Sequence, residues 1–201
     1  MPSPISDHTV PWPQAVADDY VARGYWAGVP LGTLFRRVAT QPGRGARLAL
    51  ADPAAGMRLS YRELAGRADA AAVRLFDLGM SPGDRIVVQL GNGWEFVVLT
   101  LACLRAGIVP VMALPAHRRS ELAYLARHAE ATAIAVTGQL RGFDHEALAH
   151  ELAAEVTEAT GGPWHVLVAA DWVGPDSVAL RALCAQARTP PRTAPGSTRP
   201  G

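Results

Sequence analysis

The sequence has no lysine: its 19 basic residues are all arginine, in a chain of 201 residues with 18 acidic residues. This absence excludes a phosphate-loop lysine, a Schiff base and a lysine general acid. The formal net charge of +1 argues against a basic face that binds nucleic acid, so we expect no nucleic-acid partner. The two cysteines, Cys103 and Cys184, are too few for a disulfide framework or a cysteine zinc site. We expect both to be buried free thiols in a cytoplasmic protein.

The sequence also lacks a long apolar run without breakers. The most apolar window, Phe96–Leu114, contains Arg105, Gly107 and Pro110. Arginine at a bilayer centre costs about 2.5–3.5 kcal/mol, so we interpret this window as a buried helix followed by a buried strand. The first residues, Met1–Pro13, are polar and do not resemble a signal peptide. We therefore expect no association with a membrane.

Short apolar runs alternate with helical patterns along most of the chain. The 49% apolar and 18% charged composition excludes disorder over most of the length. The predicted strands are 86–90, 108–113, 132–137 and 165–169, and the predicted helices are 94–106, 120–129, 145–157 and 176–187. Strands that alternate with helices, each continuously apolar, predict an α/β fold with a parallel sheet and helices on both faces.

Three regions differ in composition. Residues 1–40 contain clustered aromatics and two short predicted helices, 16–22 and 30–39, and we expect an N-terminal arm docked on the rest. Residues 41–187 form the predicted α/β domain. It opens with a hairpin of 48–51 and 57–59, and a helix follows in which Ser60 and Glu63 match a capping box. Residues 188–201 are rich in Pro, Gly, Ser, Thr and Arg, which predicts a disordered tail.

Two motifs suggest ligand sites but depart from the patterns that those sites require. Gly91-Asn92-Gly93 follows a strand and precedes a helix, where phosphate binds in nucleotide folds, but the third glycine of that fingerprint is replaced by Phe96. We interpret it as a simple turn. His145 and His150 lie five residues apart, about 140° around a helix, whereas a zinc helix needs four. An exposed amphipathic helix explains them better, and we predict no metal site.

One loop carries candidate binding residues. His117, Arg118 and Arg119 follow the predicted strand 108–113, at the end where open α/β sheets bind ligands. His117 could act as an acid or base, and either arginine could hold an anion. The alternative is a polar loop whose arginines pair with acidic residues of nearby helices.

Several stretches resemble the adenylate-forming superfamily, the AMP-dependent synthetases and ligases. Leu59-Ser60-Tyr61-Arg62-Glu63-Leu64 resembles its first core motif, and Leu104-Arg105-Ala106-Gly107-Ile108-Val109-Pro110-Val111 resembles its second. The run Ala113-Leu114-Pro115-Ala116-His117-Arg118-Arg119-Ser120-Glu121 is similar to the aryl-acid branch, closest to the (2,3-dihydroxybenzoyl)adenylate synthases of siderophore biosynthesis. The likeness covers roughly residues 9–185. One departure is Gly91, where the family usually has proline.

The resemblance implies a ligase that joins an aryl acid to ATP, releases pyrophosphate and passes the acyl group to a carrier-protein thiol, with magnesium. It also implies that the phosphate loop, the acid pocket, the ribose-binding aspartate and the catalytic lysine lie beyond the matched stretch. We therefore assign no catalytic, cofactor-binding or metal-binding residue here. Tyr61, Glu63, Gly107 and Pro110 are interpreted as scaffold positions.

Three hypotheses follow. The chain is the N-terminal subdomain of such a ligase, truncated before its active site and inactive alone. Alternatively, it is half of a split enzyme that a second, C-terminal polypeptide complements. The third hypothesis is a binding module without catalysis, which would use the aromatic arm or the His117–Arg119 loop.

Overall fold

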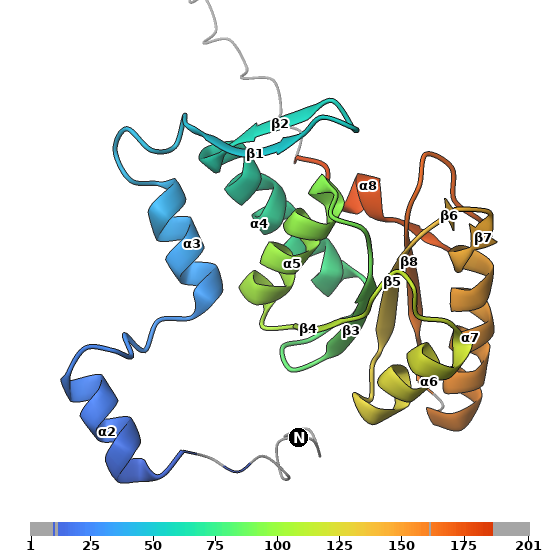
Figure 1. The fold of residues 1–201 in the computed structure, drawn as a ribbon, viewed down its shortest axis with the longest axis horizontal. Coiled ribbons are helices and arrows are strands. Elements are labelled where there is room, and N and C mark those ends of the chain that lie inside the picture. Colours follow the sequence, from blue (N-terminus) through green and yellow to red (C-terminus); the bar gives the residue numbers. More distant parts are fainter. Residues whose placement is uncertain (1–9, 11, 161, 187–201) are drawn as a thin grey trace, which may run out of the picture.

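The computed structural model describes residue 10 and residues 12–160 and 162–186 of the chain. The predicted tail, 188–201, lies outside the described residues, and the division into three regions remains a prediction. The parts described comprise a central sheet, two small hairpins and helices on both sides of the sheet (Figure 1).

The central sheet has the strand order β4-β3-β5-β8-β9, and every neighbouring pair in it is parallel. Its strands are β3 (Arg85–Gln89), β4 (Val109–Met112), β5 (Ala133–Thr137), β8 (His165–Ala169) and β9 (Val178–Ala179). The first four lie where the apolar runs predicted them. The predicted α/β class with a parallel sheet is therefore confirmed.

Helices cover both faces of the sheet, as Figure 1 shows. One face packs against α4 (Tyr61–Asp77), α5 (Trp94–Ala106) and α8 (Leu180–Leu183), and the other against α6 (Arg119–His128) and α7 (His145–Thr160). Side chains alternate between the two cores, because successive residues of a strand point to opposite faces: Ile86 and Val88 join the first core and Val87 joins the second. Burial on both faces explains the continuously apolar strands.

Local signals fix where two of the helices start and stop. The Ser60 hydroxyl accepts the Glu63 backbone N–H at 3.3 Å, and the Glu63 carboxylate accepts the Ser60 N–H at 2.8 Å. This is the predicted capping box, and it starts α4. Helix α5 ends at Gly107, whose φ of +71° suits glycine.

The last predicted helix, 176–187, is wrong in extent. The chain instead forms the strand β9 at Val178–Ala179 and then the short helix α8, and Ala179 rather than Asp176 precedes that helix. The cause is the open edge of β8, where Leu167 and Val168 pair with Val178 and Ala179. The apolar spacing of this segment fits a helix, but the free backbone groups of the sheet edge outweigh it.

Two hairpins join these elements. The predicted one is present as β1 (Leu48–Asp52) and β2 (Met57–Ser60). A second, β6 (Gln139–Leu140) with β7 (Phe143–Asp144), was not expected. Arg141 and Gly142 form its turn with φ of +52° and +76°, the backbone that two-residue hairpin loops favour.

The N-terminal arm differs from its expected docking. Helix α2 (Gln14–Ala22) has no buried residue and lies apart from the sheet in Figure 1. Its aromatics pack on one another instead, with ring centroids 5.3 Å apart for Tyr20 and Trp26 and 5.9 Å for Trp12 and Trp26. Helix α3 (Leu31–Ala39) does dock, since Phe35 packs against the first core. In the part of the chain described, no helix is long and apolar enough to cross a membrane.

Candidate functional site

The carboxyl ends of the parallel strands meet at one edge of the sheet, where open α/β folds bind ligands. The Gly91-Asn92-Gly93 turn follows β3, and the loop with His117, Arg118 and Arg119 follows β4. The structure therefore brings the sequence-predicted candidates to a single edge. What each side chain contacts there decides what the edge can do.

The start of α5 is already occupied by acidic side chains. Asp52, from β1, accepts the Trp94 backbone N–H at 3.1 Å. The Glu95 carboxylate lies close to Gly93, since a Cβ on that glycine would be 2.9 Å from Glu95 Oε2. A phosphate at this helix start would meet these carboxylates, so the structure agrees with the interpretation of 91–93 as a turn. These groups line a hollow of about 290 Å³ with Arg181.

Arg181 neutralises this acidic hollow from α8. Its Nε donates to Glu95 Oε1 at 2.8 Å, and Nη1 contacts Asp171. The hydrogen bond to Glu95 raises the pKa of Arg181. Because Glu95 and Asp171 both contact this guanidinium, Arg181 is not free to bind an anion. The residues of this hollow therefore do not fit the phosphates of ATP.

A buried polar network lies beside this hollow and centres on Gln89, which is 1% exposed at the end of β3. Its amide nitrogen donates to the carbonyls of Leu114 at 3.0 Å and His117 at 2.9 Å. Its amide oxygen lies 3.1 Å from Nδ1 of His145. With both donors used, the amide oxygen is the acceptor, which places a proton on Nδ1 of His145.

His145 starts α7 and is 2% exposed. Burial lowers its pKa, and the nearby positive charge of Arg118 lowers it further. The expectation of an exposed His145–His150 helix is therefore wrong for its first residue. His150 faces a different partner, the Ser177 hydroxyl at 2.8 Å, so the two imidazoles do not converge. Within the described residues, no three His, Cys, Asp or Glu side chains gather as metal ligands do.

The three loop candidates, His117, Arg118 and Arg119, form hydrogen bonds and ion pairs with other residues of the chain. His117 Nδ1 accepts the Leu114 backbone N–H at 3.3 Å, and Arg118 donates to the carbonyls of Pro115 and His117 at 3.0 and 2.8 Å. The Arg118 guanidinium also stands 4.2 Å from the centre of the Phe143 ring. Arg119 turns away and donates to two acids of α7, Glu151 at 2.6 Å and Glu155 at 3.0 Å. These contacts favour the structural alternative over an anion site.

The four scaffold candidates lie away from this network. Tyr61 is the first residue of α4 and its ring packs 6.4 Å from Phe35. Glu63 closes the capping box, and the Ser60 hydrogen bonds lower its pKa. Gly107 ends α5, and a Cβ there would lie 3.2 Å from Pro82. Pro110 sits in β4, opposite Ile86.

Sequence reasoning missed Gln89 and Arg181, and it considered His145 but placed it on an exposed helix. Gln89 was the detectable one, because a single amide inside an apolar strand must find buried partners. Both cysteines are buried as expected, and burial raises the pKa of each thiol to about 12, which makes them poor nucleophiles.

The fold and this edge define the class of protein: an α/β subdomain with a parallel sheet, of the kind that begins adenylate-forming enzymes. The sequence model of the AMP-binding enzyme family matches residues 34–197. The chain therefore belongs to the AMP-binding enzyme family. The match runs further than the expected limit of about residue 185 and enters the predicted tail.

Curated relatives and a solved structure agree with this family assignment. A Streptomyces salicylyl-CoA synthase / salicylate adenylyltransferase is 52% identical over 181 residues, which is 90% of this chain and 31% of that protein. The salicyl-AMP ligase / salicyl-S-ArCP synthetase of Mycobacterium tuberculosis is 44% identical over 197 residues, 94% of this chain and 33% of that protein. The apo structure of Mycobacterium smegmatis MbtA superposes with a TM-score of 0.76 at 35% identity, covering 96% of this chain and 34% of that one. The chain thus spans about a third of the length of these relatives.

Proposed function

We propose that this chain is the N-terminal subdomain of an ATP-dependent aryl-acid adenylating ligase of siderophore biosynthesis. The 52% identity to a salicylate adenylyltransferase is the observation that carries the proposal. Other relatives are named for 2,3-dihydroxybenzoate and for a 2-hydroxy-1-naphthoate. Because all of these acids carry a hydroxyl next to the carboxylate, we propose an ortho-hydroxy aryl acid as the substrate class.

The catalytic groups are proposed to come from outside these residues. A lysine near the phosphates is implied by the family resemblance, and this sequence has none. The arginines at the carboxyl edge are engaged: Arg181 by Glu95, Arg119 by Glu151 and Glu155, and Arg118 by carbonyls. ATP and magnesium would therefore be bound mainly by other parts of the ligase, and the 201-residue chain alone would be inactive.

A second candidate is a split enzyme, completed by a C-terminal polypeptide. The observation that favours it is the outer strand β4, whose Val109 and Met112 are both 49% exposed, followed by Leu114 at 62%. An open strand with apolar side chains can accept another chain. The assembled enzyme would then act with an aryl carrier protein and remain in the cytoplasm.

ATP–pyrophosphate exchange tests both candidates. We expect no exchange above background when the purified chain meets ATP, magnesium and either salicylate or 2,3-dihydroxybenzoate. Adding a polypeptide that corresponds to the remaining two thirds of a relative should restore exchange if the chain is a working half. Exchange by the chain alone would overturn the proposal that catalytic groups lie elsewhere. A complex that binds neither acid would overturn the substrate class.

A further inference from the structure

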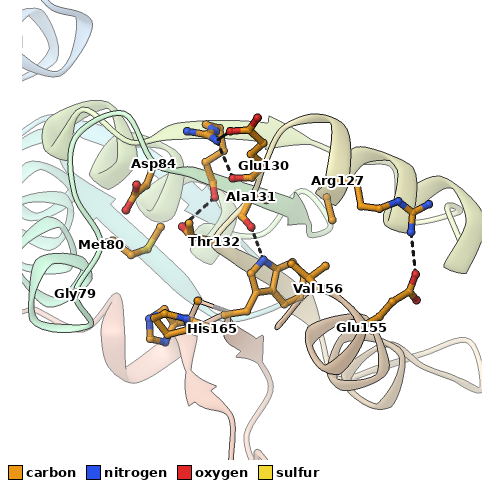
Figure 2. Close-up of a pocket in the computed structure, with 15 residues that line it drawn as sticks. Gly79, Met80, Asp84, Arg127, Glu130, Ala131, Thr132, Glu155, Val156 and His165 are labelled. Atoms are coloured by element: carbon orange, nitrogen blue, oxygen red, sulfur yellow. Dashed lines mark hydrogen bonds and ion pairs between the residues drawn. The ribbon is translucent and has the colours of Figure 1, made fainter. Parts of the chain in front are cut away.

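A second cavity lies at the opposite edge of the sheet, where the strands begin. Its volume is about 580 Å³, within the usual range for a small-molecule site. It is bordered by Arg85 at the start of β3. Thr132 just before β5 and His165 at the start of β8 also line it (Figure 2). It is therefore separate from the carboxyl edge described above.

The cavity is walled by apolar groups. Met80, Ala126, Ala131 and Val156 line it and are each at most 6% exposed. The Trp164 indole is held in place, because its Nε1 donates to the Ala131 carbonyl at 2.6 Å. A fixed indole beside small aliphatic side chains suits a planar aromatic ring.

The arginine and acidic side chains around the cavity are paired, with one exception. Arg85 donates to Glu130 at 3.0 Å and to three backbone carbonyls, and Arg127 donates to Glu155 at 2.8 Å. Figure 2 shows the Arg127–Glu155 pair at the far end from Asp84 and Met80. Asp84 is half-buried and makes no ion pair within the described residues. One of its oxygens accepts the Ser81 backbone N–H at 2.7 Å.

We propose that this cavity is a binding site for a small aromatic compound with a protonated amine. The ring would occupy the space lined by Met80 and Trp164, and the ammonium group would pair with the free oxygen of Asp84. An aromatic carboxylate would place its negative charge beside this unpaired carboxylate and is disfavoured.

Tryptamine is a suitable probe, and indole-3-acetate is its counterpart of opposite charge on the same ring. With the 201-residue chain, we expect saturable calorimetric binding of tryptamine and weaker binding of indole-3-acetate. Asp84→Asn should weaken tryptamine about tenfold, the scale of one charge-assisted hydrogen bond. Asp77→Asn is the matched control, because Asp77 is exposed at the end of α4 and does not line the cavity.

A second measurement locates the bound probe without any substitution. In spectra of the chain with ¹³C-labelled methionine methyl groups, tryptamine should shift the Met80 signal and leave Met57 and Met112 unmoved, since among the methionines of the described residues only Met80 lines the cavity. No saturable binding, a stationary Met80 signal, equal affinity for indole-3-acetate, or an Asp84→Asn variant that binds like the unaltered chain would each overturn the proposal. None of these readings depends on pyrophosphate exchange, so they are independent of the proposed ligase function.

Discussion

Buried polar side chains define the carboxyl edge at the scale of single residues. Gln89 donates hydrogen bonds to the carbonyls of Leu114 and His117 and accepts one from Nδ1–H of His145. One side chain therefore ties β3 to the loop after β4 and to the start of α7. These hydrogen bonds hold the three segments together at the carboxyl edge.

Replacing Gln89 with leucine should destabilise the fold strongly. Leucine has a similar size but leaves the Nδ1–H of His145 buried without a partner and removes one hydrogen bond each from the Leu114 and His117 carbonyls, at a cost of about 1–3 kcal/mol. The free energy of unfolding in urea measures the effect. Gln139→Leu is the control, since Gln139 is exposed in β6 and should change stability by less than about 0.5 kcal/mol. Equal effects at the two positions would contradict the network.

The lowered pKa of His145 predicts how the free energy of unfolding depends on pH. Its pKa is below the ordinary 6.5 in the folded chain, because burial disfavours the charged imidazolium. Above pH 6.5 neither state binds this proton. Below it, the unfolded chain binds a proton that the folded chain does not, so the free energy of unfolding falls until the folded-state pKa is reached. The slope from this residue is at most about 1.4 kcal/mol per pH unit.

The test compares urea unfolding of the unaltered chain and His145→Gln between pH 7.5 and 5. Glutamine keeps a donor for the Gln89 oxygen but does not titrate. We expect the variant to lose less stability as the pH falls, and superimposable pH dependences would refute the assignment.

Sequence reasoning found the location of the candidate site but not its contacts. His117, Arg118 and Arg119 do lie at the carboxyl edge, because their position after a strand determines this. His117 and Arg118 bond to the backbone of their own loop. Arg118 also contacts Phe143 of β7, and Arg119 pairs with acids of α7, at sequence separations that no local pattern reveals. For Arg119, the structure contains the ion pairs with helix acids that were predicted from the sequence as the alternative to an anion site.

At the scale of elements, glycines give a paired prediction. Gly107→Ala should destabilise the chain by about 1 kcal/mol or more, because φ is +71° and the new methyl group would lie 3.2 Å from Pro82 Cβ. Gly66→Ala should stabilise it by roughly 0.5–1 kcal/mol, since Gly66 lies inside α4 with open space at its Cβ position. Thermal unfolding of both variants measures this, and shifts of the same sign would contradict the assigned backbone roles.

Most elements were predictable, and the exceptions share a cause. Helix α5 and strand β8 have the predicted bounds, because a long apolar helix and an apolar five-residue strand are strong local signals. Strand β9 and hairpin β6–β7 are made of two-residue strands. Such short strands exist only because of their neighbours, so the sequence around them carries little evidence of them.

At the scale of the whole molecule, the chain buries two cores yet leaves large apolar side chains exposed. Val73 and Phe76 on α4 are 57% and 43% exposed, Leu31 on α3 is 63%, and Trp12 in the arm is 61%. Residues 73 and 76 lie three apart and share one side of the helix. A chain that spans about a third of its relatives would expose such surface if the remainder normally covers it.

We therefore expect the isolated chain to self-associate. Its apparent mass in sedimentation or light scattering should rise with protein concentration, because burying apolar side chains between copies is favourable by roughly 25 cal/mol per Å². Phe76→Lys should reduce this association, since it removes an aromatic ring from the exposed face of α4. Ser81→Lys adds the same charge at an exposed position outside the apolar set and should change association little. A monodisperse monomer at all concentrations, or equal effects of the two lysines, would show that this surface does not drive association.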